Sequence, residues 1–114
     1  MSSESKRLKA GVVGAGVFGG FHASKYAGHP RVDFMGVFDP SPAAARTLTE
    51  KHGGQTFDTL EALIAACDVI TVACPAVHHF AAAAAALASG KHVLVEKPIA
   101  STVEEARELV SLAS

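Results

Sequence analysis

The chain has 114 residues, 49% of them hydrophobic and 18% charged, which is enough apolar material for one folded domain with one core. Its formal net charge is −1 and its Lys and Arg residues are scattered, which argues against nucleic acid or an anionic membrane surface as a partner. No apolar run is long enough to cross a bilayer, so we expect no membrane partner.

The N-terminal segment, residues 1–7, is polar and has no apolar segment behind it that would form a signal peptide. We expect it to be a flexible tail ahead of a single domain at residues 8–114. The two cysteines, Cys67 and Cys74, form no CxxC pair, and none of the six histidines has a usual zinc-ligand spacing. We therefore expect reduced thiols, a cytoplasmic location and no metal site.

The first predicted strand, residues 8–13, runs into the sequence Gly14-Ala-Gly16-Val-Phe-Gly19 and then into a predicted helix, residues 17–27. In such a motif Gly14 permits the tight turn, Gly16 lets a pyrophosphate lie against the backbone, and Gly19 lets the helix sit close to the strand. The helix N-terminus offers unpaired N–H groups and about half a positive charge to an anion. Because a strand precedes the glycines and a helix follows them, the motif favours a dinucleotide site over a structural turn.

The second predicted strand, residues 32–38, ends at an acid, Asp39, which lies 20 residues after Gly19. An acid at this place can accept hydrogen bonds from the ribose hydroxyls of adenosine and repels a ribose 2′-phosphate. Arg46, the nearest basic residue after it, falls about two turns into the next helix. The sequence therefore predicts NAD rather than NADP as the cofactor. The structural alternative is that Asp39 and the proline after it only start a turn.

The rest of the chain continues to alternate between helices and strands, and capping-box patterns precede two of the helices. We expect helices at 42–52, 58–66, 79–89 and 101–114, and strands at 55–57, 69–73 and 92–95. This alternation predicts an α/β fold: a doubly wound, parallel Rossmann sheet of five strands in the order 3-2-1-4-5, with helices on both faces. Ligands of such sheets bind beyond the carboxyl ends of the strands.

Two charged residues, Glu96 and Lys97, directly follow the fifth predicted strand. A lysine at this edge can donate to a substrate hydroxyl or orient a carboxamide. The alternative is a solvated loop with a surface ion pair, and the composition of the loop leaves both interpretations open.

Four blocks of the chain resemble the N-terminal domain of the glucose–fructose oxidoreductase/inositol dehydrogenase (Gfo/Idh/MocA) family. They are Gly14-Ala-Gly-Val-Phe-Gly-Gly-Phe-His22, Val37-Phe-Asp39, Cys74-Pro75 followed by His79, and Gly90-Lys-His-Val-Leu-Val-Glu-Lys-Pro98. The last block, joined to the glycine loop at this distance, is specific, and the resemblance covers nearly the whole chain. It implies NAD(P)-dependent oxidation or reduction of sugar-like alcohols and their carbonyl forms.

The resemblance also implies roles for individual residues. The backbone N–H groups of Val17 and Phe18 would bind the pyrophosphate, and Lys97, the expected catalytic residue, would sit beside the nicotinamide and the substrate hydroxyl. The other residues expected to contact the cofactor are Ala73, Cys74, Pro75, His79 and Glu96, the last near the nicotinamide ribose. Cys74 departs from the family, which usually has Thr there. His22 and His79 have an equally good interpretation as packing or capping residues.

Members of this family are longer and add a sixth strand and a second α/β domain, which supplies most substrate contacts and an acid–base histidine. The resemblance therefore implies a chain truncated before the sixth strand, which binds NAD(H) but does not turn over a sugar-like substrate alone. The fifth strand would then present an open edge, so we expect a homodimer formed through this edge or by exchange of the terminal helix.

Two other functions fit the same fold: a non-catalytic NAD-binding module, and a non-redox Rossmann protein such as a methyltransferase or nucleotide-sugar enzyme. A sensor has no need of Lys97, so the presence of this lysine favours descent from an enzyme.

Overall fold

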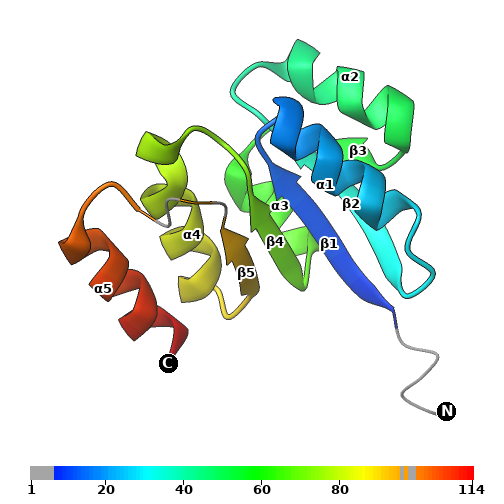
Figure 1. The fold of residues 1–114 in the computed structure, drawn as a ribbon. Coiled ribbons are helices and arrows are strands. Elements are labelled where there is room, and N and C mark those ends of the chain that lie inside the picture. Colours follow the sequence, from blue (N-terminus) through cyan, green and yellow to red (C-terminus); the bar gives the residue numbers. More distant parts are fainter. Residues whose placement is uncertain (1–6, 96, 98–99) are drawn as a thin grey trace, which may run out of the picture.

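The computed structural model describes residues 7–95, 97 and 100–114 (Figure 1). Strands and helices alternate along the chain as the sequence predicts, with small shifts at their ends. The strands are β1 (Leu8–Val13), β2 (Val32–Phe38), β3 (Gln55–Thr56), β4 (Val69–Val72) and β5 (His92–Val95). The helices are α1 (Val17–Ala27), α2 (Pro42–His52), α3 (Leu60–Ala66), α4 (His79–Ala88) and α5 (Val103–Ala113), with a 3₁₀ turn, η2 (Ala76–His78), before α4.

The five strands form one parallel sheet in the order β3-β2-β1-β4-β5, which confirms the predicted fold class. Four strands end in one row: Val13 pairs with Phe38 on one side and with Val72 on the other, and Val72 pairs with Val95. The residues that follow these strands are therefore brought together at a single edge of the sheet, as expected for a site built at the carboxyl ends of parallel strands.

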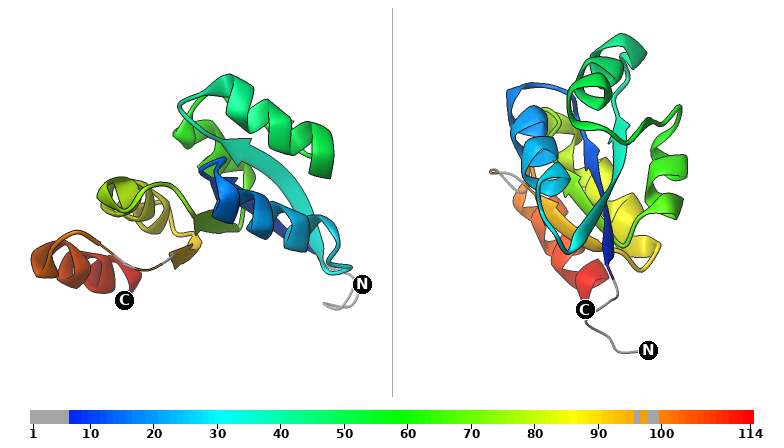
Figure 2. Two further views of the ribbon diagram at one scale, coloured as in Figure 1. Left: turned by 45° about the horizontal axis from the view of Figure 1, so that its top comes forward. Right: turned by 90° about the vertical axis from the view of Figure 1, so that its right-hand side faces the viewer.

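Helices cover both faces of the sheet (Figure 2). Helices α1 and α2 pack on one face over a small core of four buried residues, Val12, Ala23, Val37 and Ala45. Helices α3 and α4 pack on the other face over a larger core built around Leu63, Ile70 and Val72. The buried alanines of α4, Ala82, Ala83 and Ala86, belong to this core; their small side chains let the helix lie close to the sheet.

Two helices begin one residue later than their predicted capping boxes. The N-cap of α3 is Thr59 rather than Asp58, and its hydroxyl accepts a hydrogen bond from the Ala62 N–H. The N-cap of α5 is Thr102, which accepts from the N–H of Glu105, while the Glu105 carboxylate accepts from the N–H of Ser101. The last helix carries two overlapping Ser/Thr-x-x-Glu patterns, and the second one is used.

The first described residue, Arg7, is tied to the start of β2. Its guanidinium forms a 2.5 Å ion pair with Asp33 and donates to the carbonyl oxygens of Pro30 and Val32. The rest of the expected tail lies outside the described residues. None of the described helices is long and apolar enough to span a membrane.

Candidate dinucleotide site

Two of the three glycines in the loop after β1 are required by the fold itself. Gly14 has a φ of +106°, which side-chain-bearing residues rarely adopt, and a Cβ atom there would lie 2.7 Å from the backbone nitrogen of Cys74. A Cβ atom on Gly19 would overlap the carbonyl oxygen of Gly14. The glycines at 14 and 19 therefore bring the loop against the turn after β4, and helix α1 against the loop.

Gly16 is different, because nothing in the described fold requires a glycine there. Its φ of −83° suits any residue, and a Cβ atom would meet no protein atom within 4 Å. Gly16 is also the N-cap of α1 and supplies no side-chain hydrogen bond, whereas Ser41, Thr59 and Thr102 cap α2, α3 and α5 with their hydroxyls. The bare backbone and the uncapped helix fit an anion such as a pyrophosphate.

Asp39 joins the second strand to this loop. One carboxylate oxygen accepts a hydrogen bond from the Ala15 N–H at 2.9 Å, and the other accepts from the Ser41 N–H at 2.9 Å. The bond from the Ser41 N–H forms the turn that is expected if Asp39 serves only to start a turn. The bond from the Ala15 N–H is not part of such a turn and instead holds the loop after β1. Each oxygen has a further lone pair, so the half-buried carboxylate can also accept from two ribose hydroxyls.

The turn after β4 forms the opposite side of the site. The N–H of Ala73 donates to the Val13 carbonyl at 2.8 Å, which extends the β1–β4 pairing into the turn. His79 is 2% exposed, and its Nε2 lies 2.8 Å from the carbonyl oxygen of Cys74, so its imidazole supports the turn from inside the protein. Burial raises the pKa of the half-buried Cys74 thiol and the Asp39 carboxylate raises it further, while a backbone hydrogen bond lowers it.

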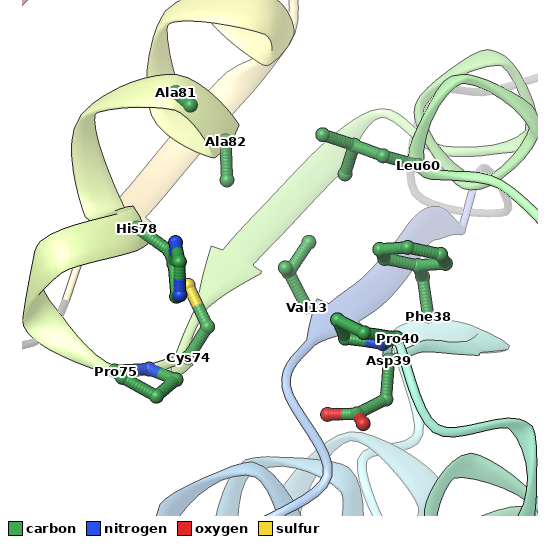
Figure 3. A pocket seen from close by; sticks show the side chains of 10 residues that line it. All are labelled: Val13, Phe38, Asp39, Pro40, Leu60, Cys74, Pro75, His78, Ala81 and Ala82. Atoms are coloured by element: carbon green, nitrogen blue, oxygen red, sulfur yellow. The ribbon is translucent and has the colours of Figure 1, made fainter.

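An open pocket of about 210 Å³ lies between these two sides (Figure 3). Asp39 and Pro40 stand on one side of it, and Cys74, Pro75 and His78 stand on the other. The remaining lining residues are apolar and come from the ends of β1 and β2 and from the first turns of α3 and α4: Val13, Phe38, Leu60, Ala81 and Ala82.

Phe38, Pro40 and Leu60 were not among the expected site residues, whereas His78 falls in the segment after β4 where ligands of parallel sheets are expected, although no role was predicted for it. Phe38 and Pro40 flank Asp39 at a strand end, which is a usable signal. Leu60 lines the pocket because α3 packs against β1 and β2, and the local sequence does not predict this packing.

The expected residues after β5 are only partly described. Lys97 is exposed and lies two residues beyond Val95, at the edge where the strands end. Glu96 lies outside the described residues. His22, on α1, packs edge-to-face against Phe21 with ring centroids 5.9 Å apart. Within residues 7–95, 97 and 100–114, no three His, Cys, Asp or Glu side chains form a candidate metal site.

A glycine loop that leads into an uncapped helix, with an acid from the next strand bonded to it, defines a dinucleotide-binding Rossmann domain. Residues 8–114 match the family model described as an oxidoreductase family with an NAD-binding Rossmann fold. The chain belongs to this family, the Gfo/Idh/MocA oxidoreductases, and is its NAD-binding domain.

Characterised proteins resemble the chain over nearly its whole length. UDP-N-acetylglucosamine 3-dehydrogenase from Acidithiobacillus ferrooxidans is 36% identical over 106 residues, which are 93% of this chain and 33% of that protein. The crystal structure of GenD2 from gentamicin A biosynthesis in complex with NAD has a TM-score of 0.91 at 36% identity, covering 98% of this chain and 33% of that one. For KijD10, a 3-ketoreductase from Actinomadura kijaniata in complex with NADP, the TM-score is 0.87 at 27% identity, covering 95% and 36%. The chain thus spans about a third of the length of these proteins.

Proposed function

We propose that this chain is the cofactor domain of an NAD-dependent dehydrogenase that acts on CH–OH groups of sugars, polyols or related compounds. The main support for the proposal is the presence of a glycine at position 16. Its glycine identity is unexplained by the protein's own packing, and it stands at the uncapped start of α1, beside the loop held by Asp39. A ligand that needs bare backbone and a helix N-terminus explains all three features.

The geometry supports one orientation of the cofactor. The pyrophosphate would lie on the N–H groups of Val17 and Phe18, whose side chains are 87% and 65% exposed. The adenosine ribose would lie on Asp39 and the adenine in the pocket between Pro40 and the turn at residues 73–75.

The surroundings of Asp39 favour NAD over NADP. A 2′-phosphate would lie next to this carboxylate, and the two backbone donors nearest to it are already bonded to the carboxylate oxygens. The hydroxyl of Ser41 is engaged as well, because it accepts the N-cap bond from the Ala44 N–H. A second phosphate would therefore meet a negative charge and donors that are already in use.

Lys97 is the catalytic residue of this proposal, supported by its place at the carboxyl edge of the sheet, two residues beyond β5. Its amino group would hydrogen-bond to the substrate hydroxyl and accept the proton that this hydroxyl must lose when the CH–OH group is oxidised, and its ammonium form would return that proton in the reverse reaction. The bound nicotinamide supplies the chemistry of hydride transfer. Ala73, Cys74 and Pro75 would line the cleft, and Glu96 is proposed near the nicotinamide ribose. His79 would act through the Cys74 carbonyl rather than by touching the cofactor.

The remaining two thirds of the related proteins have no counterpart in this chain. We therefore propose that the chain binds NAD(H) without turning over a sugar, and that the substrate-binding residues belong to another domain. A separate proposal is that the protein works in the cytoplasm, where thiols such as its two free cysteines stay reduced.

The proposal includes a homodimer formed through the edge of β5. Among the described strands, β5 pairs with β4 alone, and Leu94 on β5 is 50% exposed. Helix α5 packs against α4, and an apolar groove of about 150 Å³ lies between these helices and β5, lined by Ala83, Leu87, Val93, Val95, Leu109, Val110 and Ala113. A second copy would cover this edge, by strand pairing or by exchange of α5.

Calorimetric titration of the purified chain with NAD, NADP and S-adenosylmethionine tests the function. We expect NAD to bind, NADP to bind at least about tenfold more weakly, and S-adenosylmethionine not to bind. Binding of S-adenosylmethionine alone would replace the proposal with a non-redox Rossmann function. A measurable rate of hydride transfer by this chain alone would refute the need for a second domain.

A further inference from the structure

We propose that His78 is a cofactor-binding residue that contributes to the affinity for the adenine base, and that its imidazole packs against the face of this base. This inference rests on the proposed function, since it assumes that a dinucleotide occupies the glycine loop. Among the described residues that line the pocket between the ends of β2 and β4, only Asp39 and His78 carry an ionisable nitrogen or oxygen group, and they stand on opposite sides (Figure 3). Asp39 accepts a hydrogen bond from the loop and is proposed to bind the ribose. His78 is therefore the polar residue of the lining that can contact the base.

The backbone around His78 places this residue at the rim of the pocket. His78 ends the 3₁₀ turn η2, and its N–H donates to the Pro75 carbonyl at 2.9 Å. It is the N-cap of α4, a position where Ser, Thr, Asp or Asn usually supplies a capping oxygen, yet it makes no side-chain cap bond. The ring instead lies on the pocket wall, above Cys74 and Pro75.

The chemistry of the pocket favours contact with the face of the base over hydrogen bonds to its edge. Phe38, Leu60 and Ala82 offer apolar surface and no side-chain donor or acceptor. A flat heterocycle in this space gains mainly from packing of its two faces, and every base has an aromatic face. Recognition by His78 would therefore be strong for a base but tolerant of changes at its edge.

The two adjacent histidines have different surroundings. His79 is buried and bonded to the Cys74 carbonyl, whereas His78 is exposed at the rim of the pocket. A substitution at 78 can therefore change ligand binding without disturbing the turn that His79 supports, which makes the proposal testable.

The test compares His78→Ala and His78→Phe with the unaltered chain, measuring calorimetric affinity for NAD and for ADP-ribose. Loss of one base–aromatic contact predicts about tenfold weaker binding of both ligands to His78→Ala. His78→Phe, which keeps an aromatic face, should stay within about threefold of the unaltered chain. His92→Ala, an exposed histidine at the amino end of β5, is the matched control and should bind NAD normally. Thermal melts confirm that each variant is folded.

A base analogue distinguishes packing against the face of the base from hydrogen bonding to its edge. Nicotinamide hypoxanthine dinucleotide, whose purine has a different hydrogen-bonding edge, should bind the unaltered chain within about threefold of NAD. Unchanged NAD affinity in His78→Ala, equal losses in His78→Ala and His78→Phe, or much weaker binding of the hypoxanthine analogue would each overturn the role of His78. If the unaltered chain binds neither NAD nor ADP-ribose, the proposed function itself fails, and the inference about His78 fails with it.

Discussion

The carboxylate of Asp39 accepts a hydrogen bond from the backbone N–H of Ala15 at 2.9 Å, so the residue that follows β2 holds the loop that follows β1. The same side chain accepts from the N–H of Ser41, at the start of α2. One acid therefore positions the loop proposed to bind the pyrophosphate while it remains available to a ribose. Its contributions to folding and to binding can be separated by measuring both in the same variant.

We expect Asp39→Asn to weaken NAD binding by about tenfold or more, because a charge-assisted bond to a ribose hydroxyl is lost. Its stability should fall by about 1–2 kcal/mol, since the amide has one acceptor oxygen for two backbone donors. Calorimetry and urea unfolding give the two quantities. Asp33→Asn removes a carboxylate from the opposite end of β2 and serves as the charge control. Equal losses of NAD affinity in both variants would mean that only net charge matters.

Gly16→Ala should mainly weaken NAD binding, whereas Gly19→Ala should mainly destabilise the fold. At Gly16 the new methyl group meets no protein atom, so we expect a folded chain, destabilised by at most about 1 kcal/mol, that binds NAD roughly tenfold or more weakly. At Gly19 the methyl group overlaps the Gly14 carbonyl, so stability should fall by about 2–3 kcal/mol or more. Gly28→Ala, at the far end of α1, is the control for both. Normal NAD affinity in folded Gly16→Ala would remove the main support for the proposed function.

His79→Phe should destabilise the chain by about 1–3 kcal/mol, because the Cys74 carbonyl loses the imidazole nitrogen that lies 2.8 Å from it. His78→Phe, one residue earlier and exposed, should leave stability within about 0.5 kcal/mol. Urea unfolding of the two variants measures this contrast directly. Equal stability of both would show that the contact between His79 and the turn contributes nothing.

Stability should fall as the pH rises above about 9, in part because of Cys67. Burial raises the pKa of this thiol from 9.0 to about 12, with smaller opposing effects of nearby lysines. Between these two values the unfolded chain loses the proton and the folded chain keeps it, so unfolding is favoured by up to about 1.4 kcal/mol per pH unit. Below about pH 8 the thiol is protonated in both states and this effect is absent.

Comparison with Cys67→Ala isolates the effect from other groups that titrate at high pH. The stability difference between the two chains should be constant below pH 8 and should narrow from pH 9 upward, as followed by urea unfolding at each pH. A constant difference up to pH 11 would contradict a thiol pKa near 12.

The proposed dimer should dissociate more readily when the edge of β5 is charged. We expect Leu94→Lys to raise the dimer dissociation constant at least about tenfold in light scattering, because a lysine on an edge strand opposes pairing. Leu8→Lys, at a leucine of similar exposure on β1, is the control. A dimer that survives Leu94→Lys would be formed by helix exchange, and a monomer at high concentration would exclude both routes.

The glycine loop and Asp39 were predictable because their requirements are local. Gly14 permits the turn, Gly19 permits the close approach of the helix, and Gly16 is recognised by its spacing between them. Asp39 follows a continuous apolar strand, so each of these positions can be inferred from its immediate neighbours in the sequence. The strand order was predictable for a related reason, since short crossovers in a parallel sheet leave few topologies.

The pocket was not predictable in the same way. Leu60 and Ala82 line it because α3 and α4 pack side by side beneath the ends of β2 and β4, a relationship between distant segments. The helix starts at Thr59 and Thr102 show another limit. Adjacent residues with similar capping ability compete, so local sequence places a helix start only to within one or two residues.

The run of alanines in α4 also sets the size of the cavity beside it. Ala81 and Ala82 stand where a longer aliphatic side chain would reach across toward Leu60 and take the room offered to a heterocycle. The small side chains at these two positions therefore keep open the space proposed for the base, and Ala82 also belongs to the buried core beneath it.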